Sequence, residues 1–471
     1  MTQPLKGKVL IANRGEIAIR IMNACRDLGL DYIVVYTDAD QDSEHVRLNR
    51  TEGPDQNAWR ITSYTEPNDL FAIADHTGCT AIHPGYGFFS EDFRFARRAA
   101  LRDHPLTFIG PSWEVIRDLG DKINTKRVAN KLKIPTIPGT DSPIYNEMEA
   151  EEIAHDLLEN QRAKGIESPS ILVKAAAGGG GMGIEEVTEI EQFRRIYRQV
   201  QNYAKRQFGD GGVLIEQCLR DYNHLEVQLL CSQHNERVHF GSRNCTIQST
   251  GRQKRIEAAP GFDSACFDYE FDEQKLLNQI VEYSLKLAAH VGYNNVGTWE
   301  WIIDRQGNPY LLEVNTRIQV ENDVSARISY YKNEHPNLIR EQIRLGLGEK
   351  MGYTQDDIEF RGVAIELRIV AEDTRRDFAP WIGTISEFTF PKHEWSAVYS
   401  HVPSTRDYMI PSDFDPNLAL ALVWGKDMDE AQQRALQFIN ETVIQGHDSR
   451  GGKIITNLQY LKINLSRLLI F

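Results

Sequence analysis

The sequence predicts an α/β fold at the N-terminus, followed by a larger region of α+β type. In the first part, short apolar runs alternate with an amphipathic stretch, a pattern typical of a parallel sheet flanked by helices. The stretch Ile17–Leu28 predicts a helix. The apolar runs predict buried strands at Val9–Ala12, Tyr32–Tyr36, Ala81–His83 and Thr107–Ile109. Beyond about Tyr222 the apolar and polar residues alternate more often, which indicates two-sided strands.

Length and charge limit the classes of protein that fit. A chain of 471 residues is long enough for about three domains. The net charge of −14 argues against a nucleic-acid-binding protein, which needs basic patches. The apolar run Lys8–Ala12 is too short for a signal peptide, and no stretch is long enough for a membrane span. The six scattered cysteines indicate reduced thiols, so we expect a cytoplasmic protein without a membrane or nucleic-acid partner.

A run of glycines marks the middle of the chain. The predicted strand Ser170–Lys174 leads through three alanines into Gly178, Gly179, Gly180 and Gly181. A second strand-like segment, Ile184–Val187, follows, so the run is better interpreted as a hairpin flap than as a dinucleotide-binding turn, which opens into a helix. Backbone N–H groups of such a loop approach phosphates closely. A plain surface turn remains the alternative.

The segment Gly297–Glu321 carries the densest set of chemical groups. A hairpin with the loop Arg305–Asn308 places Glu300 opposite Glu313. Like charges paired across a ladder are unfavourable, so the two carboxylates predict a cation, with Mg²⁺ or Mn²⁺ favoured if phosphate is present. The alternative is a solvated hairpin face with two unrelated glutamates.

The same segment continues as a strict alternation. The alternation predicts one strand, with the polar side chains on one face and the apolar side chains on the other. The polar row consists of Glu313, Asn315, Arg317, Gln319 and Glu321. A similar row occurs at His224, Glu226 and Gln228. Lys174, at the end of an apolar strand beside the glycines, is well placed for a phosphate.

Four motifs together resemble the biotin carboxylase branch of the ATP-grasp superfamily. They are Ile11–Ala18, His83–Glu91, the Lys174 strand with its glycine run, and Glu313–Glu321, and the resemblance covers nearly the whole chain. It implies a Rossmann-like N-terminal domain followed by an ATP-grasp fold with a glycine-loop lid and a larger catalytic domain. The implied bounds are residues 1–121, 122–221 and 222–471.

The resemblance also implies a role for each matching residue. ATP would be bound by Lys122, Lys174, Gly178, Gly179, Gly180, Gly181, Glu216, Leu219, His224 and Gln248. Mg²⁺ or Mn²⁺ would be held by Glu300, Glu313 and Asn315. Glu321 would deprotonate bicarbonate, positioned by Arg317, Gln319, the Val320 amide and Lys254. Arg368 would stabilise the biotin enolate, and Tyr86 would border the biotin ring.

The implied reaction is ATP- and bicarbonate-dependent carboxylation of biotin at N1′ through carboxyphosphate. No biotinylation motif occurs, and Glu349–Gly352 does not qualify, so biotin is expected on a separate carrier protein or on a region outside this sequence. Carboxyltransferase subunits are expected as further partners. The sequence does not indicate the final carboxyl acceptor. Asn23 stands where some dimeric members have arginine, which leaves a homodimer open.

Two other functions fit part of the same pattern. Another ATP-grasp ligase, which joins an acid to an amine, would need the ATP-binding residues but not Tyr86, Lys254, Arg317, Glu321 and Arg368 together. A non-catalytic subunit that only binds nucleotide would have no reason to keep the carboxylates and cations. The chain departs from the family pattern at Met182, Arg252, Asn322 and Asp323.

Overall fold

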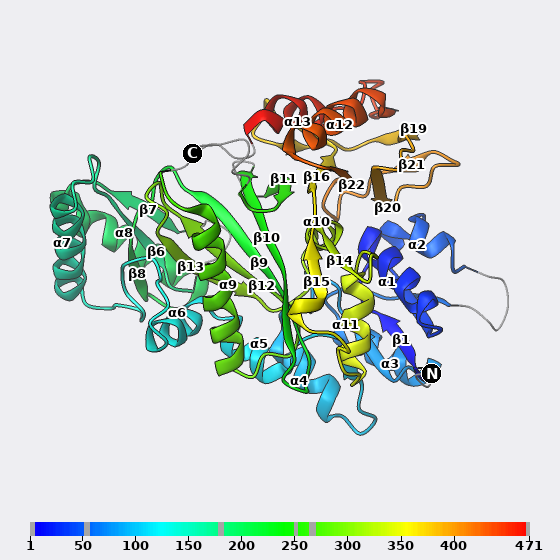
Figure 1. Ribbon diagram of the computed structural model, residues 1–471, viewed down its shortest axis with the longest axis horizontal. Coiled ribbons are helices and arrows are strands. Elements are labelled where there is room, and N and C mark those ends of the chain that lie inside the picture. Colours follow the sequence, from blue (N-terminus) through cyan, green and yellow to red (C-terminus); the bar gives the residue numbers. More distant parts are fainter. Residues whose placement is uncertain (1–4, 51–56, 178–182, 249–252, 263–269, 468–471) are drawn as a thin grey trace. The chain divides into compact units, whose positions relative to one another are not determined.

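The computed structural model describes residues 5–50, 57–177, 183–248, 253–262 and 270–467 (Figure 1). The chain divides into two compact units. The first consists of Met1–Gly120, His224–Glu300 and Val314–Ile470, and the second is built mainly from Asp121–Asn223 and Trp301–Glu313. The domain bounds 1–121, 122–221 and 222–471 remain a prediction.

The N-terminal part of the first unit contains the expected parallel sheet. Within the described residues it has five strands in the order β3-β2-β1-β4-β5, and each neighbouring pair is parallel. The strands are β1 (Lys8–Ile11), β2 (Asp31–Tyr36), β3 (Ala58–Arg60), β4 (Ala81–His83) and β5 (Thr107–Phe108). The helices are α1 (Gly15–Asp27), α2 (Glu44–Arg47), α3 (Pro67–Thr77), α4 (Phe93–Leu101) and α5 (Trp113–Leu119). The predicted fold class is confirmed; the short edge strand β3 was not predicted.

Alternation along the strands places helices on both faces of this sheet. Val9 and Ile11 of β1 pack in one core with the apolar side of α1, where Ile17 and Ile21 are fully buried. Leu10 of the same strand faces a second core that includes residues of α3 and α4. Successive side chains of a strand point to opposite faces, so the one strand serves both cores.

The turn after β4 positions Tyr86. Gly85 has φ +63°, a conformation that L side chains rarely adopt, and a Cβ there would lie 2.8 Å from Asn13 Nδ2. Asn13 Nδ2 donates to the carbonyls of Pro84 at 2.6 Å and Tyr86 at 2.8 Å. A side chain following β1 therefore fixes the backbone that follows the neighbouring strand β4. This is the carboxyl edge of a parallel sheet, where such folds usually bind ligands.

A larger sheet forms the centre of the first unit. Its strands run in the order β12-β9-β10-β11-β16-β22-β20, and β9–β10–β11–β16–β22–β20 pair antiparallel. Their bounds are β9 (Asn223–Cys231), β10 (Arg237–Gln248), β11 (Lys254–Ala259), β12 (Asn295–Ile303), β16 (Val363–Val370), β20 (Ser396–Ser400) and β22 (Asn417–Gly425). The mixed α+β character expected for this region is confirmed.

Helices cover both faces of this sheet around β16 (Figure 1). Ile365, Leu367 and Ile369 pack in one core with residues of α12. Ala364, on the other face, packs with Val324 of α10. The helices of this region are α9 (Glu273–His290), α10 (Asn322–Ile328), α11 (Leu338–Gly346), α12 (Met428–Glu441) and α13 (Leu458–Asn464). In the described part of the chain, no helix has the length and apolar character needed to cross a membrane.

Short strands complete the first unit. They form three small antiparallel groups among the described residues, ordered β14-β15, β17-β18 and β21-β19-β23. Their bounds are β14 (Ser329–Tyr331), β15 (Ile358–Phe360), β17 (Glu372–Asp373), β18 (Ala379–Pro380), β19 (Thr384–Thr389), β21 (Tyr408–Met409) and β23 (Val443–His447).

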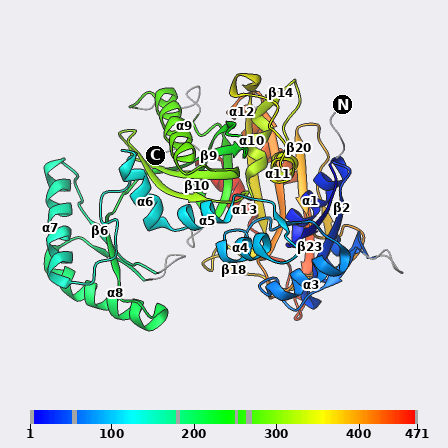
Figure 2. The same ribbon diagram turned by 90° about the horizontal axis from the view of Figure 1, so that it is seen from below.

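The second unit is a small sheet with two helices on one face (Figure 2). Strand β6 (Ile171–Ala175) lies between β7 (Ile184–Val187) and β8 (Val213–Gln217), antiparallel to both. Ile171 and Val173 of β6 pack against α7 (Glu147–Ala163) and α8 (Phe193–Phe208), so the intervening side chains face the other way. Helix α6 (Lys122–Lys131) and the outer part of the hairpin to β13 (Pro309–Asn315) belong to the same unit. The predicted hairpin around the glycine run is present as β6–β7.

Candidate active site

Polar side chains gather on one face of the large sheet. On β9, His224, Glu226 and Gln228 alternate with the buried Leu225 and Val227, as the sequence predicts. All nine residues of β9 are buried, so the polar ones need partners inside the protein. The partners come from β10, β11, β12 and the segment that follows β13, which builds a cluster of opposite charges.

Lys254 lies at the centre of this cluster. Its Nζ donates to Glu321 Oε1 at 2.7 Å and to Glu300 Oε1 at 3.3 Å, and it forms a close ion pair with Glu226. Burial disfavours the ammonium, but these carboxylates outweigh that cost and raise the pKa of Lys254 well above its usual value. Lys254 therefore stays charged and holds three carboxylates in place.

Arg243 supports Glu226 from the adjacent strand. The two residues are directly opposite in the β9–β10 ladder, and Glu226 Oε2 accepts from Arg243 Nε at 3.0 Å and Nη2 at 2.6 Å. Arg243 Nη1 also donates to Gln228 Oε1 at 2.9 Å and Ser325 Oγ at 3.1 Å. Both charged side chains are fully buried. The polar row on β9 included Glu226, but no pattern in the sequence pointed to Arg243 as its partner.

Glu300 on β12 receives donors at both carboxylate oxygens. Its Oε1 accepts from Asn315 Nδ2 at 2.6 Å and from Gln319 Nε2 at 3.3 Å, and its Oε2 lies 2.9 Å from His224 Nε2. Burial opposes ionisation of Glu300, but Lys254 and His224 outweigh it and lower its pKa well below the usual range. Glu300 is therefore an anion at neutral pH.

Gln248 fixes the orientation of the His224 ring. The Gln248 amide Nε2 donates to His224 Nδ1 at 2.8 Å. An imidazole nitrogen that accepts carries no proton, so in neutral His224 the proton is on Nε2, which donates to Glu300. These two nucleotide-site candidates thus contact each other and a metal-site candidate.

The oxygen atoms at and around Glu300 are suitable ligands for a hard divalent cation. Glu300 supplies carboxylate oxygens and Asn315 an amide oxygen, the ligand types that Mg²⁺ prefers. Ligand atoms of His224, Glu226 and Glu300 lie within 4.8 Å of one another. Glu313, in the second unit, forms an ion pair with Lys122. The pairing of Glu300 with Glu313 remains a prediction.

The predicted strand Glu313–Glu321 is wrong over its second half. Strand β13 ends at Asn315, and α10 begins at Asn322. The intervening backbone is held by side chains instead of a ladder: Thr316 N donates to Glu91 Oε1 at 3.1 Å, and Asn322 Nδ2 donates to the Gln319 carbonyl at 2.8 Å. The polar side chains still point away from the buried Ile318, as the alternation predicted, but the backbone that places them there is a loop and not a strand.

Arg317 is anchored on three sides. It donates from Nε to Glu91 Oε2 at 2.9 Å, from Nη1 to Gln319 Oε1 at 3.1 Å and from Nη2 to Asn315 Oδ1 at 3.2 Å. Glu91 ends the His83–Glu91 motif but was not selected as a site residue. The structure brings that motif and the Glu313–Glu321 motif together through this ion pair.

Arg368 contacts the opposite side of Glu321. Its Nη2 donates to Glu321 Oε2 at 3.4 Å and to Glu257 Oε1 at 3.2 Å. Burial opposes ionisation of Glu321, but Lys254 and Arg368 outweigh it and lower its pKa.

Tyr86 donates a close hydrogen bond to Glu16, and burial is the main reason that the pKa of Tyr86 is raised. Glu257 and Glu16 were not selected from the sequence.

A separate pair of cations lies in the second unit. On the face of its sheet away from α7 and α8, Lys174 Nζ donates to Glu216 Oε2 at 2.6 Å. Lys126 Nζ, from α6, donates to Glu216 Oε1 at 2.9 Å. Burial opposes ionisation of Glu216, but the two lysines outweigh it and lower its pKa. Lys126 was not predicted. Leu219 lies in the loop after β8.

Two sets of predicted positions lie outside the described residues. The glycines Gly178, Gly179, Gly180 and Gly181 belong to the first set, together with Met182. Arg252 belongs to the second. The nucleotide contacts proposed for Gly178 to Gly181 therefore rest on the family resemblance.

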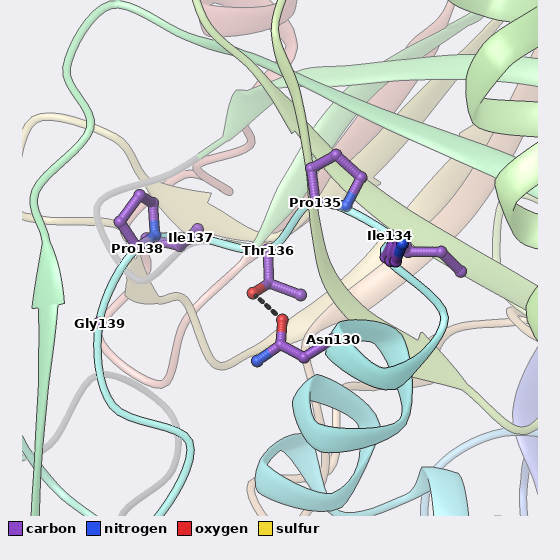
Figure 3. Close-up of a pocket in the computed structure, with 8 residues that line it drawn as sticks. Asn130, Ile134, Pro135, Thr136, Ile137, Pro138 and Gly139 are labelled. Carbon is purple, nitrogen blue, oxygen red and sulfur yellow. Dashed lines mark hydrogen bonds between the residues drawn. The ribbon is translucent and has the colours of Figure 1, made fainter.

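The second unit also contains an open cavity of about 420 Å³, drawn in Figure 3. It is lined by residues at the end of α6 and in the segment that follows this helix: Asn130, Lys133, Ile134, Pro135, Thr136, Ile137, Pro138 and Gly139. Thr136 Oγ1 donates to Asn130 Oδ1 at 3.0 Å across it. None of the candidate site residues lines this cavity.

Family models match most of the chain. The biotin carboxylase N-terminal domain matches residues 6–116, the ATP-binding domain of the carbamoyl-phosphate synthase L chain matches 121–354, and the biotin carboxylase C-terminal domain matches 366–462. The biotin carboxylase of Nostoc sp. is 36% identical over 98% of this chain and 97% of its own length. The chain belongs to the biotin carboxylase family. The family expected from the four motifs is thereby confirmed.

Other relatives and solved structures agree with this membership. The 2-oxoglutarate carboxylase small subunit of Hydrogenobacter thermophilus is 36% identical over 93% of this chain and 87% of its own length. The biotin carboxylase domain dimer of that organism's enzyme, solved with MgADP, ADP and bicarbonate, has TM-score 0.83 at 33% identity and covers 98% of this chain and 94% of its own. A Campylobacter jejuni biotin carboxylase complex has TM-score 0.82 at 30% identity, with 98% and 95% covered. These likenesses confirm the ATP-grasp biotin carboxylase fold.

Proposed function

We propose that this chain uses ATP and bicarbonate to carboxylate biotin at N1′, the first half-reaction of a biotin-dependent carboxylase. The observation that carries the proposal is the buried cluster around Lys254. It places a carboxylate base, Glu321, between two cations, Lys254 and Arg368, at 2.7 Å and 3.4 Å. The family membership and the relatives solved with ADP and bicarbonate support the same conclusion.

Glu321 is the proposed base for bicarbonate. Because neighbouring cations lower its pKa, Glu321 is ionised at neutral pH, the form in which a carboxylate can act as a base. The bicarbonate would be positioned by Arg317, Gln319 and the Val320 amide. Lys254 would offset the negative charge that develops as a bicarbonate oxygen attacks the γ-phosphoryl group of ATP. The bond between the γ-phosphorus and the β-phosphate oxygen breaks, so the products are carboxyphosphate and ADP, and the bicarbonate proton is on Glu321.

The ATP contacts are proposed for the residues that the family resemblance assigns to the nucleotide. Lys122 and Lys174 are the phosphate cations, with the glycines Gly178 to Gly181 as backbone donors. Glu216, Leu219, His224 and Gln248 would lie around the nucleotide. In the second unit, Glu216 binds Lys174 at 2.6 Å, so it would hold the lysine extended until phosphate competes for it.

Mg²⁺ or Mn²⁺ would be held by Glu300, Glu313 and Asn315. A bound divalent cation would supply positive charge that offsets the charge of the ATP phosphates during transfer. The chain's own contribution is to keep Glu300 anionic through Lys254 and His224. Asn315 and Gln319, which donate to Glu300 Oε1, hold this carboxylate in the orientation in which it would bind the ion.

Arg368 and Tyr86 are proposed for the biotin site. Arg368 would donate to the ureido oxygen of biotin and stabilise the enolate, while the phosphate released from carboxyphosphate takes the N1′ proton. The carbon dioxide formed with that phosphate joins N1′. Tyr86 would border the ring, on a turn fixed by Asn13.

The proposal includes partners. One relative is named as the small subunit of 2-oxoglutarate carboxylase and another as a pyruvate carboxylase subunit, which supports a separate biotin carrier protein and carboxyltransferase subunits. The dimeric relative supports a homodimer. Free thiols at the described cysteines support the cytoplasm as the compartment.

The test is ATP hydrolysis by the purified chain with Mg²⁺, with and without bicarbonate and free biotin. Turnover should require bicarbonate and rise with biotin. Glu321→Gln should lower it at least about 100-fold, whereas the control Glu387→Gln, an exposed carboxylate on β19, should not. Turnover that is indifferent to both additions would refute the proposed function.

A further inference from the structure

Two glutamates face each other behind the biotin-site arginine. Glu257 of β11 and Glu366 of β16 are directly opposite in the antiparallel ladder. Their exposed fractions are 0% and 1%. Two negative charges so placed repel each other, and neither is in contact with solvent to relieve this.

Their hydrogen bonding is incomplete. Among the described residues, neither oxygen of Glu366 has a hydrogen-bond partner, and Glu257 Oε2 has none either. Glu257 Oε1 accepts from Arg368 Nη2 at 3.2 Å. A buried carboxylate needs donors at both oxygens, whereas a protonated carboxyl supplies its own O–H. The pair therefore lacks the donors that two ionised groups would need.

The rest of the environment does not supply them. The other ladder neighbour of Glu366 is Leu422, and the same face continues into an apolar core that includes Ala364 and Val324. The charged groups that act on the pair are Arg368 from β16, Glu321 from the preceding loop, Lys254 of β11, Glu226 of β9 and Arg20 of α1. Arg20 is already engaged, since it donates to Asn322 Oδ1 at 3.0 Å.

We propose that Glu257 and Glu366 share one proton, and that the pair, with a single negative charge, positions the Arg368 guanidinium beside Glu321 for biotin. Both glutamates are positioning residues. The inference rests on the proposed function for the role of Arg368, but the protonation of the pair does not. Burial also raises the pKa of Glu257 to about 7 and that of Glu366 well above its usual value, in agreement with the geometry.

The shared proton sets the balance of charge on Arg368. When the pair holds one proton, Arg368 lies between one negative charge on the pair and one on Glu321. Its Nη2 is 3.2 Å from Glu257 Oε1 and 3.4 Å from Glu321 Oε2. Loss of the proton would double the negative charge behind Arg368 and draw the guanidinium away from the biotin side. The KM for biotin should therefore rise as the pair deprotonates at alkaline pH.

The first test measures the proton directly. Infrared spectra of the whole chain should show a protonated-carboxyl C=O band that is missing from Glu366→Gln. Glu257→Gln, which removes the other half of the pair, should lose or shift the same band. The matched control is Glu372→Gln: Glu372 is also buried, but each of its two oxygens accepts a hydrogen bond from Arg255, at 2.7 and 2.6 Å. A band that is unchanged in both Glu366→Gln and Glu257→Gln would overturn the shared proton.

The second test measures the positioning role with free biotin as the substrate. In wild-type protein the KM for biotin should rise about fivefold or more towards alkaline pH, and in Glu366→Gln, whose amide cannot ionise, that rise should disappear. Glu372→Gln should keep the wild-type profile. An identical rise in Glu366→Gln would overturn the positioning role. Because the spectra need no turnover, an inactive chain that shows the expected bands refutes the proposed function and leaves the shared proton supported.

Discussion

Arg243→Leu should destabilise the first unit strongly, because it removes the partner of a buried charge. Arg243 and Glu226 are both fully buried and joined by two hydrogen bonds of 3.0 and 2.6 Å. Leucine fills part of the same volume but, among the described residues, leaves Glu226 with Lys254 as its single counter-ion. It also removes the donor to Gln228 and Ser325.

The expected loss follows from the free-energy cost of an unpaired buried charge. Removing one partner of a buried ion pair costs about 3–5 kcal/mol. Since Lys254 still contacts Glu226, we expect the lower end, about 3 kcal/mol of unfolding free energy. Arg243→Lys should lose less, but still more than about 1 kcal/mol, because an ammonium cannot reproduce the two-pronged contact.

Urea unfolding followed by tryptophan fluorescence measures this loss, since Trp299 and Trp301 of β12 are fully buried. The decisive comparison adds Glu226→Gln to Arg243→Leu. Removing the stranded charge should recover at least about 1 kcal/mol. A loss below about 1 kcal/mol for Arg243→Leu, or no recovery in the double variant, would refute the reasoning.

Two further predictions concern the turn at Tyr86 and the response to pH. Gly85→Ala should lower stability by about 1–3 kcal/mol, because φ is +63° and the new Cβ would meet Asn13; Gly29→Ala, at φ +69° with nothing within 4 Å, is the control for strain alone in thermal unfolding. The pKa of Glu257 is raised from 4.5 to about 7, so the folded state binds the carboxyl proton of Glu257 more tightly than the unfolded state does. Its contribution to stability is therefore lost as pH rises from about 4.5 to 7, by roughly 3 kcal/mol. The thermal midpoint of Glu257→Gln relative to wild type should be higher at pH 8 than at pH 5, and a difference independent of pH would contradict this.

The sequence by itself determined features that depend on neighbouring residues. Alternation over His224–Gln228 predicted the polar face of β9, and the residues on either side of the glycine run predicted the β6–β7 hairpin. The four motifs were sufficient to predict the family. These signals are readable because side-chain direction along a strand has a period of two, whatever the strand packs against.

Only the tertiary structure decided which distant residues meet. The extension of β13 to Glu321 was wrong because a strand needs a partner, and beyond Asn315 the backbone bonds to Glu91, a residue far earlier in the chain. The pattern of neighbouring residues in the sequence does not indicate such a distant partner. Arg243 likewise reads as one more strand residue until the β9–β10 register places it against Glu226.

The pairing of Glu257 with Glu366 shows the same division most clearly. Each glutamate alternates with apolar neighbours on its own strand, which the sequence shows. That they face each other is fixed by the register of two strands far apart in the chain, set by the cores that those strands bury on their other face. Charge in a protein interior depends on such neighbours, so the protonation of this site is a property of the fold.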